Sequence, residues 1–315
     1  MIVPSSIALE ASSFCQLRCP SCPTTTGAIN AAIGRGFLTL ENFRTLIDAN
    51  PTLRRIELSN YGEIFLNPAL LEILEYAFRA GVAIVMDNSV NLNDVRDSAL
   101  EGLVKFGVER LTCSIDGASA ETYRQYRVRG DFDRVIANIE RINHFKRIYA
   151  SERPHLTWQF IVFGHNEHEL PKARQMAESL GMAFSPKLSW DTAFSPVRDA
   201  DFVVKETGFK AASRAEHDRI TGEKFMNGLC HQLWDKPQIN WDGKVLGCCR
   251  NFWGDFGGNA LTDGLTASIN SEKMNHARAM LQGEIAPRDD VPCASCEIYH
   301  FMRDNAQWLK RPEAG

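Results

Sequence analysis

The chain has 315 residues, of which 44% are hydrophobic and 23% are charged, and its formal net charge at pH 7 is -4. This length and composition predict a globular protein with one large domain and one smaller one. No run of Lys or Arg is available to bind a nucleic acid backbone. Residues 1–14 do not resemble a signal peptide and no window reaches the roughly 18 apolar residues of a membrane span, so we expect a cytoplasmic protein without a membrane partner.

Between residue 7 and about residue 190, short β-rich runs alternate with longer amphipathic stretches. This alternation predicts βα units and therefore an α/β fold with a parallel sheet. The runs apolar enough to be buried strands are Ile7–Ala11, Arg55–Ser59, Val82–Asp87, Arg110–Ile115, Leu156–Phe163 and Ala183–Leu188.

The last third of the chain has a different pattern. Residues 191–229 lose the βα alternation and are rich in polar and small residues, which indicates a linker or a substrate-facing insertion. Beyond them, Asp242-Gly243 between two short apolar runs is a type I′ turn signal and predicts a β-hairpin over 238–248. A helix over about 271–282 should follow. We therefore expect a main domain over 1–190, a linker over 191–229 and a cysteine-bearing domain over 230–315.

Nine cysteines make an odd number, and no secretion signal precedes them, so metal ligation is a better prediction than disulfides. All of them except Cys113 belong to two groups, one near the N-terminus and one in the last third. Cys113 lies in a predicted strand and is expected to be a small buried apolar side chain. The two groups predict two separate metal sites.

Cys15, Cys19 and Cys22 follow the first predicted strand in a C-x3-C-x2-C arrangement. A structural zinc ion needs four protein ligands, whereas a [4Fe-4S] cluster bound by three cysteines leaves one iron open for a small molecule. The loop also follows the carboxyl end of a strand, where α/β folds place their reactive sites. A zinc knuckle with a fourth ligand from elsewhere is the alternative.

This triplet, placed after the first strand of a six-unit βα chain, resembles that of the radical S-adenosylmethionine (SAM) superfamily. The resemblance implies a partial (β/α)6 barrel similar to a TIM barrel, and a [4Fe-4S] cluster whose open iron is chelated by SAM. It also implies SAM contacts at the ends of the second, third and fourth strands, namely Gly62, Glu63, Asn88, Ser114 and Asp116. The family usually has an aromatic residue immediately before the third cysteine, where this chain has Ser21.

The C-terminal group consists of Cys230, Cys248, Cys293 and Cys296, with Cys249 next to Cys248. The spacing C-x12-G-x4-C followed by C-x2-C resembles the SPASM and twitch extensions of radical SAM enzymes. This likeness implies one auxiliary [4Fe-4S] cluster with four cysteine ligands. A zinc ribbon is the alternative, because four cysteines also satisfy tetrahedral zinc. The spacing does not decide between Cys248 and Cys249.

The resemblance implies an enzyme that cleaves SAM reductively and removes a hydrogen atom from its substrate, with flavodoxin or ferredoxin as the one-electron donor. We expect oxidation of a small hydroxylated metabolite, such as a sugar or an aminocyclitol. A maturase of a ribosomal peptide is one alternative, and a radical epimerase with Cys249 as hydrogen donor is another. A zinc-binding structural or interaction protein is the alternative that is not an enzyme. Arg127 or Arg129 is a candidate contact to a carboxylate of SAM or substrate.

Overall fold

The computed structural model describes residues 1–310. Its strands form a single sheet in the order β6-β5-β4-β3-β2-β1-β7-β8. Neighbouring strands from β6 to β7 run parallel, and only β8 is antiparallel to its neighbour. The strands are β1 Ser6–Leu9, β2 Arg55–Glu57, β3 Ala83–Val90, β4 Arg110–Ser114, β5 His155–Val162, β6 Ala183–Leu188, β7 Gln238–Ile239 and β8 Val245–Gly247.

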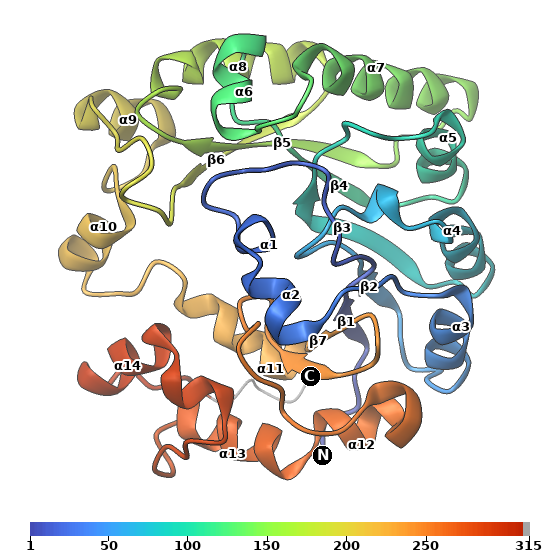
Figure 1. Ribbon diagram of the computed structural model, residues 1–315, viewed down its shortest axis with the longest axis vertical. Helices are drawn as coiled ribbons and strands as arrows, with labels where there is room; N and C mark the ends of the chain where they lie inside the picture. Colours follow the sequence, from blue (N-terminus) through green and yellow to red (C-terminus); the bar gives the residue numbers. More distant parts are fainter. Residues whose placement is uncertain (311–315) are drawn as a thin grey trace.

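The sheet curves into an open barrel, with a row of helices on its convex side (Figure 1). The row comprises α3 Leu40–Asp48, α4 Leu70–Arg79, α5 Asp97–Lys105, α6 Ala120–Tyr126, α7 Phe132–Ile148 and α8 Leu170–Ser179. The loop after β1 carries α1 Pro23–Thr26 and α2 Ala28–Ile33 and lies on the concave side (Figure 1). The remaining helices are α9 Ala200–Thr207, α10 Arg214–Thr221, α11 Gln232–Asp235, α12 Leu265–Ile269, α13 Glu272–Leu281 and α14 Glu297–Asp304.

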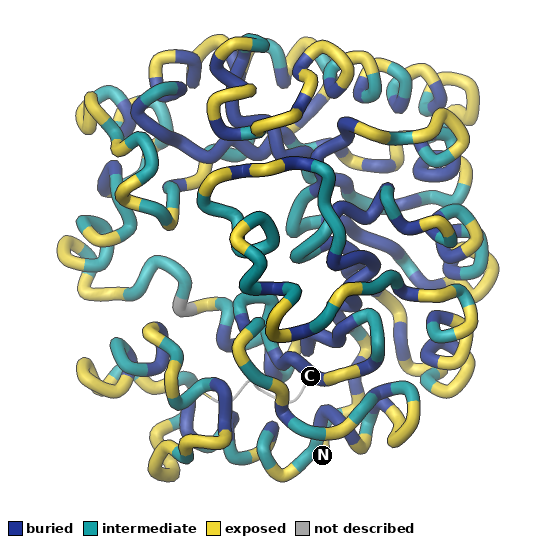
Figure 2. Tube along the Cα trace, viewed as in Figure 1, coloured by how far each residue is buried: buried dark blue, intermediate teal, exposed yellow. Residues whose placement is uncertain are grey.

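The two faces of the sheet differ because successive strand residues point to opposite sides. One face packs Ile56, Leu111 and Trp158 against the helices in the main core. The opposite face carries polar side chains, among them Glu57 and Gln159. The buried strands and the exposed outer surfaces of the helices are visible in Figure 2. The concave side of the barrel is therefore the polar side, and it is where the loop after β1 lies.

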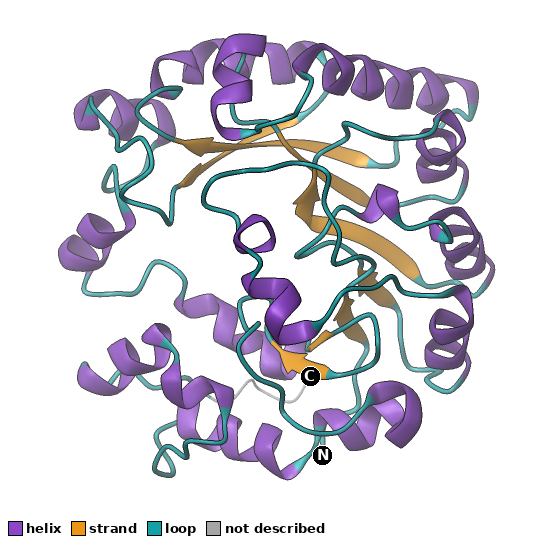
Figure 3. Ribbon diagram, viewed as in Figure 1, coloured by secondary structure: helices purple, strands orange, loops and turns teal. Residues whose placement is uncertain are grey.

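The six strands predicted from apolar runs are all present, with bounds within a few residues of the expected ones. Cys113 is 1% exposed and belongs to the main core, as expected for a small apolar side chain. Helix α13 coincides with the helix predicted over 271–282. Figure 3 shows these strands and helices by type.

The predicted hairpin is present, but its turn is not of type I′. The Gly243 amide donates to the Asn240 carbonyl at 2.9 Å, and the Asn240 amide donates to the Lys244 carbonyl at 2.8 Å. Only Gly243 has a left-handed φ, of 90°, whereas a type I′ turn requires positive φ at both central residues. The connection is therefore a three-residue loop closed by a glycine bulge. Because β7 also pairs with β1, the hairpin extends the main sheet.

Residues 191–229 are more ordered than the expected linker, because they contain α9 and α10. Asp199 and Ser213 cap these helices by accepting from backbone amides, and Gly208 and Gly222 end them with left-handed φ values. Short amphipathic helices with polar surfaces are difficult to recognise from periodicity alone. The division of the chain into 1–190, 191–229 and 230–315 stays a prediction. Among the described residues, no helix is long and apolar enough to cross a membrane.

Two isoleucines of helix α7 allow a test of how tightly the core around the sheet is packed. Ile139 is 0% exposed and Ile148, on the same helix, is 59% exposed. We expect Ile139→Ala to lower the free energy of unfolding by about 2–5 kcal/mol, because the truncated side chain leaves a cavity. Ile148→Ala should change it by less than about 0.5 kcal/mol. Urea denaturation of both variants under anaerobic conditions tests this, and equal losses would contradict the packing described here.

Candidate active site: two cysteine groups at a polar barrel edge

The loop after β1 brings Cys15, Cys19 and Cys22 together. The Cys22 amide donates to the Cys19 carbonyl at 3.1 Å, and helix α1 begins directly after Cys22 with Pro23 in its first turn. Burial, followed by the nearby Glu63 carboxylate, raises the pKa of the Cys15 thiol to about 12. The charges of Cys19 and Cys22 act in the same direction. A bound metal is what makes such buried, neighbouring thiols ionise.

The side chains of Asn91 and Arg127 approach these sulfur atoms. The Asn91 amide nitrogen Nδ2 lies 3.7 Å from Cys15 Sγ, and an Arg127 nitrogen lies 3.7 Å from Cys19 Sγ. Arg127 also forms an ion pair between its Nε and Asp116 Oδ2 at 2.6 Å, in which Asp116 is 0% exposed. The second Asp116 oxygen accepts from the Ile161 amide at 2.7 Å. Asp116, predicted to contact SAM, thus has both oxygens engaged by the protein.

The loop after β2 carries the predicted Gly62-Glu63 motif close to the cysteine loop. A Cβ atom on Gly62 would lie 2.0 Å from the backbone oxygen of Ser12, so only glycine allows this approach. The Glu63 amide donates to the Phe14 carbonyl at 2.6 Å. The Glu63 carboxylate is buried, and its oxygens accept from the amides of Asn91 at 2.7 Å and Phe65 at 3.3 Å. Glu63 therefore fixes two loops against each other.

Glu10 and Glu57 were not recognised from the sequence as parts of the site. Glu10 accepts from the amides of Tyr61 at 3.0 Å and Gly62 at 3.4 Å, and burial raises its pKa to about 8. Glu57 accepts from the Ser59 and Asp87 amides at 2.9 and 2.7 Å. The sequence signal that could have identified them is a Glu between apolar residues of a predicted buried strand. A buried carboxylate is costly unless it has a partner, so such a Glu is expected to accept hydrogen bonds.

The end of β3 is irregular, and it presents predicted SAM contacts to the concave side. The register between β3 and β4 shifts between Met86 and Val90, and Ser89 has a left-handed φ of 84°. Ser89 Oγ lies 2.5 Å from Ser114 Oγ, on the neighbouring strand. Within residues 1–310, the Asn88 Nδ2 atom and the Gln159 Oε1 atom are buried without a hydrogen-bond partner. Buried polar atoms normally have a partner, so these two atoms fit the binding of a polar ligand such as SAM.

The C-terminal cysteines meet at a separate cavity. Cys230, Cys248, Cys293 and Cys296 all line it together with apolar side chains that include Leu233 and Tyr299. Burial raises the pKa of the Cys248 thiol to about 12, and the neighbouring Cys249 acts in the same direction. The hairpin supplies Cys248, and the segment before α14 supplies Cys293 and Cys296.

Cys249 does not line this cavity. Its amide donates to Gln232 Oε1 at 2.8 Å. Burial raises the pKa of the Cys249 thiol. The charged groups that act on this thiol include Lys236 and Glu57. Glu57 is the last residue of β2 and lies on the concave side of the barrel. The adjacent residues Cys248 and Cys249 therefore face different surroundings, one the cysteine cavity and the other the barrel.

Two hydrogen bonds connect this C-terminal segment with the loop after β2. Tyr61 Oη donates to the Asn251 carbonyl at 2.7 Å, and Asn60 Nδ2 donates to the Cys249 carbonyl at 3.1 Å. The C-terminal segment is thus held against the loop that carries Gly62 and Glu63.

A model of the radical SAM superfamily matches residues 9–176, more than half of the chain, and a model of SPASM, an iron-sulfur cluster-binding domain, matches residues 230–297. The chain belongs to the radical SAM superfamily. It is 34% identical over 139 residues to the AdoMet-dependent heme synthase of Methanosarcina barkeri. That match covers 44% of this chain but only 38% of the curated relative.

Solved radical SAM enzyme structures share the fold. SuiB of Streptococcus suis, bound to S-adenosylmethionine, has a TM-score of 0.66 at 12% identity, over 95% of this chain and 72% of SuiB. The enzyme anSMEcpe with bound AdoMet has a TM-score of 0.56 at 14% identity, over 94% of this chain and 87% of its own. BtrN in complex with AdoMet and 2-DOIA has a TM-score of 0.54 at 14% identity and covers 94% of both chains.

Membership of this family brings SAM and a [4Fe-4S] cluster as cofactors, and the SPASM match adds an auxiliary iron-sulfur cluster. Within residues 1–310, no group of three or more His, Cys, Asp or Glu side chains could hold a single metal ion. Tetrahedral zinc, with sulfur ligands at about 2.3 Å, requires such convergence. A four-iron cluster instead binds each thiolate to a different iron. The match to an iron-sulfur cluster-binding domain favours a cluster over a zinc ion in the C-terminal part of the chain.

The Arg127–Asp116 pair provides a test of the site's electrostatics. Arg127→Met leaves the buried Asp116 carboxylate without its cation, and we expect a loss of about 3–5 kcal/mol in the free energy of unfolding. The double variant R127M/D116N should recover part of this loss. Arg134→Met is the control, since Arg134 pairs with Asp94 at 3.2 Å on the surface and its loss should have little effect. Urea denaturation distinguishes these outcomes, and equal losses for R127M and R134M would contradict the assigned role.

Proposed function

We propose that this radical SAM enzyme oxidises a small hydroxylated metabolite, such as a sugar or an aminocyclitol. The observation that carries the proposal is the C-terminal cavity with four cysteines on its wall. These cysteines would provide full ligation for an auxiliary cluster. A fully ligated cluster has no open iron for substrate and is suited to accept an electron. The polar concave face of the barrel, with the Gln159 side chain, supports a hydrophilic substrate.

Cys15, Cys19 and Cys22 would hold the SAM-binding [4Fe-4S] cluster, and Cys230, Cys248, Cys293 and Cys296 the auxiliary one. When bound, the cofactors would supply a radical that removes a hydrogen atom from a substrate carbon. They would also supply an acceptor for the second electron. The protein orients the substrate and excludes water. The hydroxyl proton passes to solvent, so the substrate loses two electrons and two protons in total.

The residues proposed to position SAM are Gly62, Glu63, Asn88, Ser114 and Asp116. Gly62 allows the close backbone approach that brings this loop to the cysteine loop. Glu63 and Asp116 would act through the loops and the Arg127 side chain that they hold. The buried side-chain nitrogen of Asn88 has no hydrogen-bond partner in the described part of the chain, so we propose Asn88 as a direct contact to SAM. A flavodoxin or a ferredoxin is the proposed electron donor.

The cofactor assignment is tested by anaerobic reconstitution. We expect about eight irons per chain, because each [4Fe-4S] cluster holds four, and formation of 5′-deoxyadenosine after SAM and dithionite are added. C15A/C19A/C22A should retain about four irons and form no deoxyadenosine. C230A/C293A should also lose about four irons, yet still cleave SAM. Bound zinc without SAM cleavage would refute the proposal. Oxidation is then tested by supplying sugars and aminocyclitols, with a carbonyl product expected for each deoxyadenosine formed.

A second candidate function is redox-neutral epimerisation with the Cys249 thiol as hydrogen donor. The position of Cys249 outside the cysteine cavity and near Glu57 favours it. In this reaction, Cys249→Ala should abolish product formation with iron content unchanged, and the wild-type product formed in D2O should carry deuterium on carbon. Cys113→Ala is the control for loss of a thiol in the core. Unchanged turnover of C249A would exclude the donor role.

A further inference from the structure

Lys187 and Arg214 bring two positive charges together at the carboxyl end of β6. Lys187 is the last but one residue of this strand, and Arg214 is the first residue of α10. Arg214 Nε donates to the carbonyl of Leu188, the residue after Lys187, at 3.0 Å. Its guanidinium lies over the rings of Phe225 and Trp190, at 5.0 and 5.9 Å from their centroids. The backbone bond and the two rings hold Arg214 beside Lys187.

Among residues 1–310, no carboxylate forms an ion pair with Lys187 or Arg214. In the part of the chain that the structure describes, Lys187 Nζ and the terminal nitrogens of Arg214 have no hydrogen-bond or ion-pair partner. The acidic groups whose charges act on Lys187 and Arg214 are paired with other residues: Asp116 with Arg127 at 2.6 Å, Asp87 with Arg110 at 2.6 Å, Glu297 with Arg250 at 2.6 Å and Asp218 with Lys224 at 3.0 Å. Two neighbouring cations without a counter-charge are unfavourable unless a ligand supplies one.

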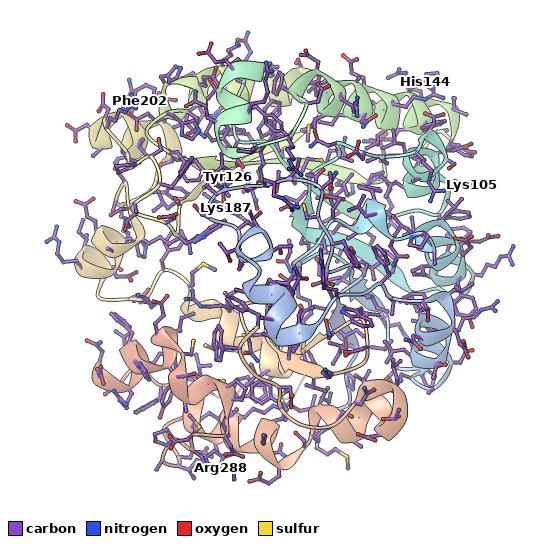
Figure 4. The ribbon with its side chains drawn as sticks, viewed as in Figure 1. Lys105, Tyr126, His144, Lys187, Phe202 and Arg288 are labelled. Carbon is purple, nitrogen blue, oxygen red and sulfur yellow. The ribbon has the colours of Figure 1, made fainter. Side chains whose placement is uncertain are left out.

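The pKa values of Lys187 and Arg214 are both lowered, as expected for partly desolvated, neighbouring positive charges that repel each other. Partial desolvation by the surrounding protein, followed by the Arg214 guanidinium, lowers the pKa of Lys187, whose side chain keeps contact with solvent. Burial, followed by the Arg250 guanidinium, lowers the pKa of Arg214 to about 10, so Arg214 stays charged at neutral pH. Lys187 is exposed, because it borders the open concave side, and its label lies there in Figure 4. The Lys187 ammonium is thus accessible to a ligand on the concave side of the barrel.

The pair lies between the two cysteine groups. Trp190, which follows β6, donates from Nε1 to the Ser21 carbonyl at 3.3 Å, next to Cys22. On the other side, the charge of Cys249 acts on Lys187. Strand ends of this kind are where βα barrels bind their substrates. The two terminal nitrogens of Arg214 also match the two oxygens of a carboxylate or phosphate.

We propose that Lys187 and Arg214 form a binding site for an anionic group of the substrate, either a carboxylate or a phosphate. This inference rests on the proposed function in taking the polar barrel edge as the substrate site. It narrows the hydroxylated substrate to acidic or phosphorylated sugars and disfavours a cationic aminocyclitol.

The test is anaerobic calorimetry on the reconstituted full chain at constant ionic strength, with three probes. Inorganic phosphate represents a phosphate group, D-glucuronate a carboxylate, and D-glucose is the neutral control. We expect at least one anion to bind and D-glucose not to bind, and the tighter anion identifies the group. Lys187→Met and Arg214→Gln should each weaken anion binding by about tenfold, the loss of one charge-assisted contact.

Matched controls separate this effect from a general loss of charge or of fold. Lys205→Met and Arg219→Gln remove exposed cations from α9 and α10 and should leave binding unchanged. The conservative variants K187R and R214K retain the charge and should retain most of the affinity. Iron content and SAM affinity should be the same in all variants.

Anion binding that is equal in K187M, R214Q and the wild type, or absent from the wild type, would overturn the proposal. A loss of SAM affinity in K187M without any effect on the anions would also overturn it, because the cations would then serve the carboxylate of SAM. Because calorimetry does not depend on SAM cleavage, a negative result here with normal deoxyadenosine formation leaves the radical SAM assignment standing.

Discussion

Buried carboxylates that accept backbone hydrogen bonds are the constraint on which the site depends. Glu10, Glu57 and Glu63 each receive amide hydrogens from a loop or irregular strand end at the carboxyl edge of the sheet. These segments are too irregular to satisfy their own amides, and an unpaired buried amide costs about 1–3 kcal/mol. Burial raises the pKa of Glu10 to about 8 and that of Glu63 to about 7, and the bonds to the amides oppose this effect.

Buried glutamates also accept hydrogen bonds from loop amides on the other side of the barrel. Glu169 accepts from the Ala118 amide at 2.6 Å, and Glu167 accepts from the amides of Arg198 and Asp199 at 2.9 and 3.0 Å. The loops after β4 and β6 are therefore anchored in the same way as those after β2 and β3. With their amides bound internally, these loops can present other side chains to a ligand. The barrel can therefore have a polar concave face although its other face packs against the helices in an apolar core.

The strands of the fold could be predicted from local sequence patterns. Each predicted strand is an apolar run bounded by turn residues, and burial between helices on one side and loops on the other favours such runs. Helices α9 and α10 escaped recognition because their stabilisation comes from caps at Asp199 and Ser213 more than from a wide apolar stripe. The prediction of a type I′ turn at Asp242-Gly243 is wrong, because Asp-Gly fits either connection and the pairing of β7 with β8 selects the three-residue loop.

The sequence by itself determined the family and the chemistry of the cofactors, because closely spaced cysteines remain together in any fold of their loop. Only the tertiary structure decided which distant residues meet. Cys248 lines the cysteine cavity and Cys249 does not, a difference set by the direction of the chain after the hairpin. Lys187 and Arg214 are likewise 27 positions apart (214 − 187) and meet only because α10 folds back onto the end of β6. Such contacts depend on long-range packing, which local spacing does not encode.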